Sequence, residues 1–124
     1  MKKNILVVAD SATIRSLQAF ILQSAGFKVE TASNGIEALE KLYCGNFDLI
    51  VADINMPKMD GLKMIETLRK QDIYRDLPII IVTSEEDKED REKGLKAGAN
   101  VYLVKPTDPK TLVMNVKMLL DGEF

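Results

Sequence analysis

The sequence predicts an α/β fold, a three-layer sandwich in which helices cover both faces of a five-stranded parallel sheet. Five short apolar runs alternate with five stretches of helical periodicity, which is the pattern of βαβ units. The chain has 124 residues, of which 46% are apolar, and this suffices for one hydrophobic core. No repeat, linker or low-complexity tract interrupts it. We therefore expect one domain over residues 1–124.

The predicted strands are short and apolar, and they span residues 4–9, 28–31, 48–53, 79–83 and 101–104. The third contains an uninterrupted apolar run at residues 49–52, which is typical of a strand covered on both faces. This run leads directly into Asp53. A carboxylate at the end of a buried strand is unfavourable unless a partner compensates its charge, so Asp53 indicates a functional site.

Four of the five helical stretches combine a start or stop signal with an apolar face. The first follows Ser11 and stops at Gly26, which permits a left-handed backbone. The second begins near residues 33–34, Asp60 is a natural N-cap for the third, and Pro109 suits the first turn of the fifth. The residues expected to face the core are Ile14, Leu17, Ile21 and Ala25, then Leu39 and Leu42, then Leu62, Ile65 and Leu68, and finally Leu112, Val116 and Leu119.

The fourth helical stretch, residues 85–96, lacks an apolar face. It reads EEDKEDREKGLK, and Leu95 is its only large apolar residue. Ion pairs such as that between Glu89 and Lys93 contribute only about 0.2–0.5 kcal/mol each. Two interpretations remain open: a solvated surface helix, or a loosely held element that can move.

Composition argues against several classes of function. The 17 basic and 19 acidic residues give a net charge of −2, so neither a nucleic acid nor an anionic membrane is expected as a partner. The apolar runs are too short for a membrane span or a secretion signal, and we expect a cytoplasmic protein. The absence of histidine excludes a Cys/His zinc set and a Ser-His-Asp triad. The single cysteine, Cys44, is expected to pack against a helix.

Four polar residues end or follow predicted strands, namely Asp10, Asp53, Thr83 and Lys105. The carboxyl ends of parallel strands meet at one edge of the sheet, where ligands bind. Two nearby carboxylates repel each other, and Mg²⁺ relieves this repulsion while leaving room for a phosphoryl oxygen. Together with a lysine and a hydroxyl, such an edge suits phosphoryl transfer. Taken singly, Asp10 and Thr83 have an alternative as helix caps and Lys105 as a surface lysine.

With these residues in place, the chain resembles the receiver domains of bacterial two-component signalling, the CheY-like response regulators. The matching stretches are ILVVADSATIR, DLIVADINMPKMDG, PIIIVTSEE and VYLVKPTD, and the resemblance extends over residues 4–120. It implies the flavodoxin-like strand order 2-1-3-4-5. It also implies a switch and not a turnover enzyme. A sensor histidine kinase or phosphotransfer protein would donate the phosphoryl group, and a downstream target protein would recognise the face of the fourth helix, fifth strand and fifth helix.

The resemblance implies a role for each matching residue at the phosphorylation site. Asp53 corresponds to the phosphoacceptor, and Asp10, Asp53 and the backbone carbonyl of Asn55 correspond to the Mg²⁺ ligands. Lys105 matches the lysine that pairs with the phosphoryl group. Thr83 matches the hydroxyl that moves towards that group.

Three further positions match residues that switch or tune the family. Tyr102 corresponds to the aromatic residue that changes rotamer together with the threonine, with ordinary packing as its alternative. Asn55 and Glu85 fall where the family tunes autodephosphorylation.

The stretch VVADS departs from the family pattern, which usually has two adjacent acids after the first strand. Here the first of them is replaced by Ala9, so we expect weaker Mg²⁺ binding than in a typical member.

Two alternatives to the switch are open, and the departure at Ala9 bears on the first of them. A pseudo-receiver would use the same fold as an unphosphorylated interaction module. An aspartate-nucleophile phosphatase would need an acid where this chain has Asn55. Flavodoxin-type flavin binding is disfavoured because ADSATIR contains no glycine.

Overall fold

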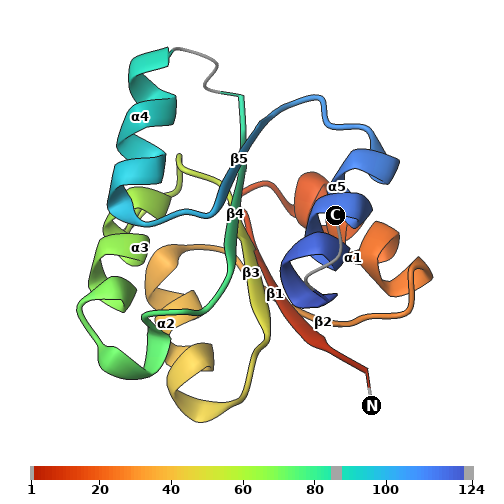
Figure 1. Cartoon of the computed structure of the whole chain (residues 1–124), viewed down its shortest axis with the longest axis horizontal. Coiled ribbons are helices and arrows are strands. Elements are labelled where there is room, and N and C mark those ends of the chain that lie inside the picture. The colour runs from red at the N-terminus through yellow and green to blue at the C-terminus, as the bar shows by residue number, and fades with distance from the viewer. Residues whose placement is uncertain (1, 85–87, 122–124) are drawn as a thin grey trace.

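The computed structural model describes residues 2–84 and 88–121, and it confirms the predicted three-layer sandwich (Figure 1). The strands are β1 (Asn4–Val8), β2 (Lys28–Ala32), β3 (Leu49–Ala52), β4 (Ile79–Thr83) and β5 (Val101–Val104). They are parallel and lie in the order β2-β1-β3-β4-β5, as the resemblance implied. Every predicted strand boundary lies within one residue of the observed one.

The helices are α1 (Ala12–Ser24), α2 (Gly35–Cys44), α3 (Gly61–Arg69), α4 (Lys88–Ala97) and α5 (Pro109–Asp121). A short 3₁₀ helix, η1 (Asp72–Tyr74), was not predicted. Figure 1 shows α1 and α5 on one face of the sheet and α2, α3 and α4 on the other. In the described part of the chain, no helix combines the length and the apolar character that crossing a bilayer requires.

The predicted helix signals are present in the structure. The capping oxygens accept hydrogen bonds from first-turn backbone N–H groups and belong to Ser11, Asn34 and Asp60, at 3.3, 2.9 and 2.8 Å. Gly26 has a φ of +99° after α1. At α2 the backbone N–H of Ser33 also donates a hydrogen bond to the Glu37 carboxylate, and this bond lowers the pKa of Glu37.

The core consists of two apolar clusters, one on each face of the sheet. Leu6, Val8 and Ile50 belong to the cluster under α2 and α3, whereas Val7 and Val51 belong to the cluster under α1 and α5. Adjacent strand residues alternate between the clusters because successive side chains point to opposite faces. All four residues of β3 are buried, as expected for its apolar run.

Two sequence predictions about burial are wrong. Leu17, expected to face the core, is 52% exposed, while the residues of α1 that are buried are Gln18 and Leu22. Ile14 and Ile21, on the same side of the helix, are only partly buried. Cys44 is exposed at the last residue of α2, because the helix buries Leu39 and other residues instead.

Helix α4 contacts the sheet through a residue that has no side chain. Gly94 is its only buried residue among those described, and a Cβ there would lie 2.9 Å from both Ile81 Cδ1 and Tyr102 Cδ2. Leu95 is 45% exposed. The solvated-helix interpretation agrees with these observations, and movement of α4 stays a prediction. The first part of the predicted stretch, residues 85–87, lies outside the described residues.

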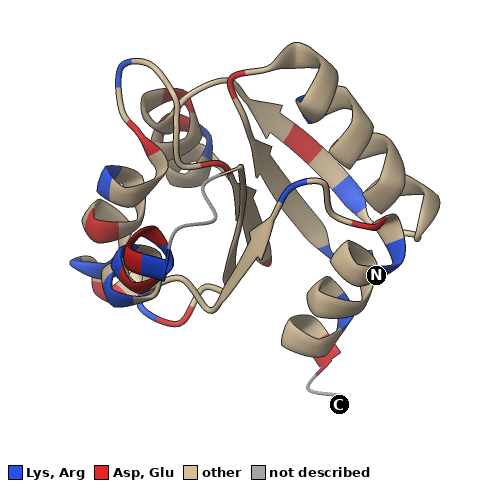
Figure 2. Ribbon diagram, turned by 90° about the horizontal axis from the view of Figure 1, so that it is seen from above, with Lys and Arg blue, Asp and Glu red and all other residues tan. Residues whose placement is uncertain are grey.

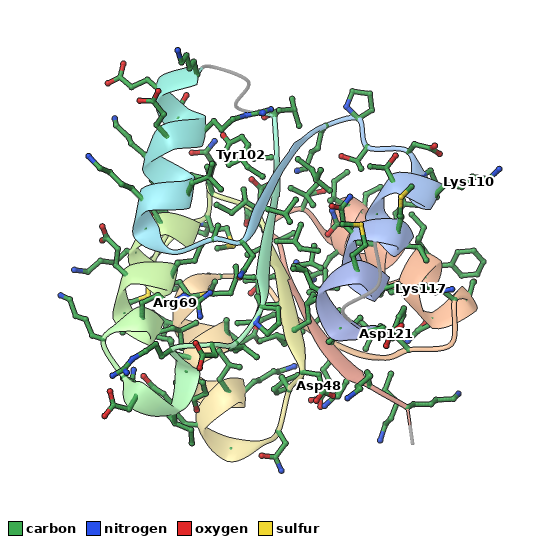
Figure 3. All side chains as sticks on the ribbon, in the orientation of Figure 1. Asp48, Arg69, Tyr102, Lys110, Lys117 and Asp121 are labelled. Atoms are coloured by element: carbon green, nitrogen blue, oxygen red, sulfur yellow. The ribbon has the colours of Figure 1, made fainter. Side chains whose placement is uncertain are left out.

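Arg69 is the last residue of α3, and its side chain forms hydrogen bonds to the turn between α4 and β5. Its guanidinium donates hydrogen bonds to the carbonyl oxygens of Gly98, Tyr74 and Arg75, at 2.8, 2.7 and 3.1 Å, and to Asn100 Oδ1 at 3.2 Å (Figure 3). Burial lowers the pKa of this guanidinium, although arginine stays charged at any physiological pH. These hydrogen bonds connect α3 to the turn that precedes β5, at the end of the sheet away from the predicted site.

Candidate functional site

The candidate site lies at the carboxyl edge of the sheet, which is the upper edge in Figure 1. Val8 of β1 is level with Ala52 of β3, so Asp53 and the residues that follow β1 emerge side by side. A backbone hydrogen bond of 3.0 Å from the Asp53 N–H to the Val8 oxygen continues this pairing. On the other side, Thr83 is level with Val104 of β5.

Asp53 and Lys105 are in direct contact at this edge. The Lys105 Nζ atom lies 2.5 Å from Asp53 Oδ2, and the side chains of Lys105 and Asp53 are only 21% and 15% exposed. The other carboxylate oxygen, Oδ1, accepts a 2.7 Å hydrogen bond from the backbone N–H of Ile54. The ammonium group thus compensates the charge of a carboxylate that lies at the end of a buried strand.

The Asp53 carboxylate keeps acceptor capacity for a ligand. Each ionised carboxylate oxygen has about two acceptor positions, and the structure describes one donor on each. The side chain also remains partly exposed at the rim. Its geometry is suited both to cation binding and to nucleophilic attack on phosphorus.

Gly61 fixes the loop that follows Asp53, and sequence reasoning did not single it out. Its backbone N–H donates a 2.8 Å hydrogen bond to the Ile54 oxygen, and a Cβ at this position would lie 2.2 Å from the Asp53 carbonyl oxygen. Any other residue would therefore displace β3 or α3. The sequence signal was the glycine directly after the Asp60 cap.

Arg15 fixes the loop after β1 and was also missed. Its Nη1 donates hydrogen bonds to the backbone oxygens of Ala9 and Asp10, at 2.9 and 3.1 Å. The Asp10 side chain itself is exposed. A long basic side chain one turn after a helix N-cap was the available signal.

Thr83 and Tyr102 lie on the side of the site that faces α4. Thr83 is fully buried, and its backbone oxygen accepts a 2.7 Å hydrogen bond from the Lys105 N–H. Tyr102 is 6% exposed, and the guanidinium of Arg91 in α4 lies 5.6 Å from its ring centroid. Asn55 is exposed in the loop after β3, and Glu85 lies outside the described residues.

The oxygen donors at this edge fit Mg²⁺. The ion accepts one or two carboxylates with carbonyl and water oxygens, and here Asp10, Asp53 and the Asn55 carbonyl follow neighbouring strands. Within residues 2–84 and 88–121, no group of three or more His, Cys, Asp or Glu residues is placed to hold a metal. The described donor set is consequently limited to two carboxylates.

Comparison with known proteins identifies similar chains. Residues 5–117 match the family model described as response regulator receiver domain. The chain is 39% identical over 120 residues to the alkaline phosphatase synthesis transcriptional regulatory protein PhoP of Bacillus subtilis, covering 97% of this chain and 49% of that protein. It is 36% identical to the phosphate regulon transcriptional regulatory protein PhoB of Escherichia coli, covering 97% and 52%. The chain thus spans about half the length of the curated relatives it matches.

Solved structures give the same result for the fold. The Vibrio cholerae chemotaxis protein CheY4 has a TM-score of 0.91 and 39% identity, over 97% of this chain and 100% of that one. The response regulator TrrA of Thermotoga maritima, solved in complex with Mg²⁺ and BeF, has a TM-score of 0.86 and 39% identity, over 95% and 99%.

Proposed function

Since the chain belongs to the response regulator receiver domain family, we propose that Asp53 accepts a phosphoryl group and that its phosphorylation changes the α4–β5–α5 face. Receiver domains are signalling switches that bind Mg²⁺ and interact with histidine kinases or phosphotransfer proteins. The observation that supports the proposal most strongly is the 2.5 Å contact between Lys105 Nζ and the partly buried Asp53 carboxylate.

In the proposed reaction, an Asp53 carboxylate oxygen attacks the phosphorus of a phosphohistidine. The new O–P bond forms as the P–N bond breaks, and the electron pair of that bond leaves with the imidazole of the donor. Asp10, Asp53 and the Asn55 carbonyl would hold Mg²⁺, which supplies charge neutralisation for the transferred group. Lys105 then pairs with a phosphoryl oxygen in place of the free carboxylate.

The proposed switch reaches α4 through β4 and β5. Phosphorylation replaces a carboxylate by a group with about one more negative charge and three strong acceptor oxygens. Lys105 and the Thr83 hydroxyl are its proposed donors, and the Thr83 backbone oxygen already accepts a hydrogen bond from the Lys105 N–H. Tyr102 connects this part of the sheet to α4. A useful switch requires a coupling of about 1–3 kcal/mol between phosphorylation and partner binding.

Phosphorylation with a small-molecule donor tests the function. The protein is incubated with acetyl phosphate and MgCl₂, and its intact mass is measured. We expect one added phosphoryl group, which Asp53→Asn abolishes. Asp60→Asn is the matched control, because asparagine also caps α3 and the adduct should persist.

The other outcomes of this assay distinguish the alternatives. Failure of the wild type to form any adduct would favour the pseudo-receiver. Continuous turnover of phosphate esters would favour the phosphatase.

The Ala9→Asp variant tests whether the missing acid weakens Mg²⁺ binding. Ala9 follows Val8 and is therefore level with Asp53, so a carboxylate there would join the proposed ligands. We expect the variant to bind Mg²⁺ several-fold more tightly in a calorimetric titration, because ligand charge largely sets affinity for hard cations. Ala9→Asn adds a similar volume without charge and should not gain affinity. Equal affinities of wild type and Ala9→Asp would refute the explanation.

A further inference from the structure

A partly enclosed pocket of about 380 Å³ lies between α1, β4, the segment that follows β5 and the start of α5. We propose that this pocket binds a small, mostly apolar molecule that carries one amide group, and that this amide pairs with the side-chain amide of Gln18. The lining residues other than Gln18 are the apolar Ile14, Leu17, Ile21, Val82, Pro106 and Leu112 and the polar Lys105 and Thr107.

Gln18 is a buried polar residue that lacks a partner in the described part of the chain. It is 7% exposed, and its side-chain amide forms no hydrogen bond to any residue that the structure describes. Asn34, which is buried to a similar extent, caps α2. Buried polar side chains are normally hydrogen-bonded, because an unpaired donor or acceptor has lost its bonds to water without replacement. Since Gln18 lines the pocket, a molecule bound there can supply the missing partner.

Water alone is a poor occupant of this pocket. The volume corresponds to about a dozen water molecules at about 30 Å³ each. An ordered water needs about two to four polar partners, whereas most of the lining side chains are aliphatic. A water can reach the Gln18 amide, but an apolar molecule suits the remaining walls better. Apolar walls with a few polar groups, at this size, are typical of small-molecule sites.

The polar lining residues favour an amide over a charged group. The Gln18 amide offers both donors and an acceptor. The Thr107 hydroxyl donates a 3.1 Å hydrogen bond to the Val104 oxygen, so towards a ligand it can only accept. The Lys105 ammonium is bonded to Asp53, which compensates its charge. A carboxylate can only accept and would leave the Gln18 oxygen unpaired, whereas an amide both donates and accepts.

The pocket and the proposed phosphorylation site share one residue, Lys105. Asp10, Asp53 and Thr83 do not line the pocket. Binding is therefore measured on unphosphorylated protein without Mg²⁺. A pocket that binds nothing would leave the proposed function intact, and a protein that accepts no phosphoryl group could still bind the amide.

Benzamide, toluene and benzoate test the proposal. They share a phenyl ring and differ in the attached group, which is a neutral amide, a methyl group or a carboxylate. Binding is followed by NMR of the Gln18 side-chain amide and of the methyl groups of Val82 and Leu112, with Ile50 and Leu68 in the opposite cluster as references. We expect benzamide to shift the pocket signals without shifting the reference signals. It should bind about tenfold more tightly than toluene or benzoate, because only benzamide satisfies both parts of the Gln18 amide.

Gln18→Leu supplies the decisive control. Leucine has a similar volume without polar atoms, so the variant should lose the preference for benzamide and bind toluene at least as tightly as the wild type does. Gln23→Leu, on an exposed position of the same helix, should leave both affinities unchanged. In urea denaturation Gln18→Leu should be no less stable than the wild type, because it removes an unpaired buried amide.

Any of three outcomes would overturn the proposal. The first is that none of the compounds shifts the Gln18 and Leu112 signals, which would leave the pocket to water. The second is equal binding of the three compounds, or an unchanged preference for benzamide in Gln18→Leu, because the amide would then not recognise the ligand. The third is a Gln18→Leu protein that unfolds at a lower urea concentration, because Gln18 would then have a stabilising partner within the folded chain.

Discussion

Helices α5 and α4 flank β5 on opposite faces of the sheet, yet they are held by different forces. Helix α5 buries Leu112 and Val116 in the cluster on its face, and burial of such side chains contributes about 1.5–3 kcal/mol each. Helix α4 buries only Gly94 among its described residues. Figure 2 shows charged residues crowded on α4, whereas α1 and α5 are mostly uncharged. Helix α4, which the proposed switch must move, therefore buries less apolar surface than α5 does.

The same comparison separates two kinds of surface. Most charged residues of α4 are exposed, and the movement of this helix in the proposed switch stays a prediction. By contrast, Leu17 and Phe20 of α1 and Met114 of α5 are apolar side chains that are more than half exposed to solvent.

The largest expected effect is the loss of a core side chain under α5. Leu112 is 2% exposed, so Leu112→Ala should lower the free energy of unfolding by about 3 kcal/mol in urea denaturation. Leu95→Ala, which removes the only large apolar residue of α4, should cost less than about 1 kcal/mol because that side chain is 45% exposed. Equal costs would contradict the contrast between the two helices.

Adding one methyl group under α4 should have an intermediate effect. Alanine is favoured over glycine in a helix by about 1 kcal/mol, but a Cβ at Gly94 would lie 2.9 Å from Ile81 and Tyr102. Overpacking of this kind costs about 1–3 kcal/mol, so Gly94→Ala should be destabilising by about 1 kcal/mol. Glu92→Ala, on an exposed position of the same helix, is the control and should be neutral or slightly stabilising. A stabilised Gly94→Ala protein would show that α4 already stands away from β5.

Removing the cation over Tyr102 should have a smaller effect. Arg91→Gln should cost about 0.5–1 kcal/mol of unfolding free energy and shift the NMR signals of the Tyr102 ring. Lys88→Gln on the same helix should do neither. Unchanged ring signals in Arg91→Gln would mean that Arg91 does not hold α4 against Tyr102.

The smallest expected effect is a pH-dependent one at the start of α2. Glu37 has a pKa below its ordinary value of 4.5, chiefly because its carboxylate accepts a hydrogen bond from the Ser33 N–H. The charged form thus stabilises the fold above that ordinary value, and this contribution is lost as the pH falls through the lower folded-state pKa. Glu37→Gln should cost a few tenths of a kcal/mol at pH 7, since the group is partly exposed.

The two proteins should become equally stable at acidic pH, where Glu37 is protonated in both states. Urea denaturation at pH 7 and at successively lower pH measures this difference. A difference that grows on acidification would contradict the assigned sign.

Local signals in the sequence were enough to predict the five strands and the five α-helices of this fold, but not the short 3₁₀ helix η1. The apolar run of β3 and the caps Ser11, Asn34 and Asp60 act over only a few residues, so pattern and propensity predict them directly. Asp53 was recognisable for the same reason, because a carboxylate directly after a buried strand is visible in the sequence.

Contacts between distant segments were decided only by the tertiary structure. The helical spacing of Leu17 predicts that it faces the core, yet the position of α5 leaves it exposed along a groove. Gly61 and Gly94 are required by atoms of Asp53 and of Tyr102, which lie eight positions away from each glycine and in other elements. Periodicity specifies which residues share a face of a helix, but what covers that face depends on how the helices pack around the sheet.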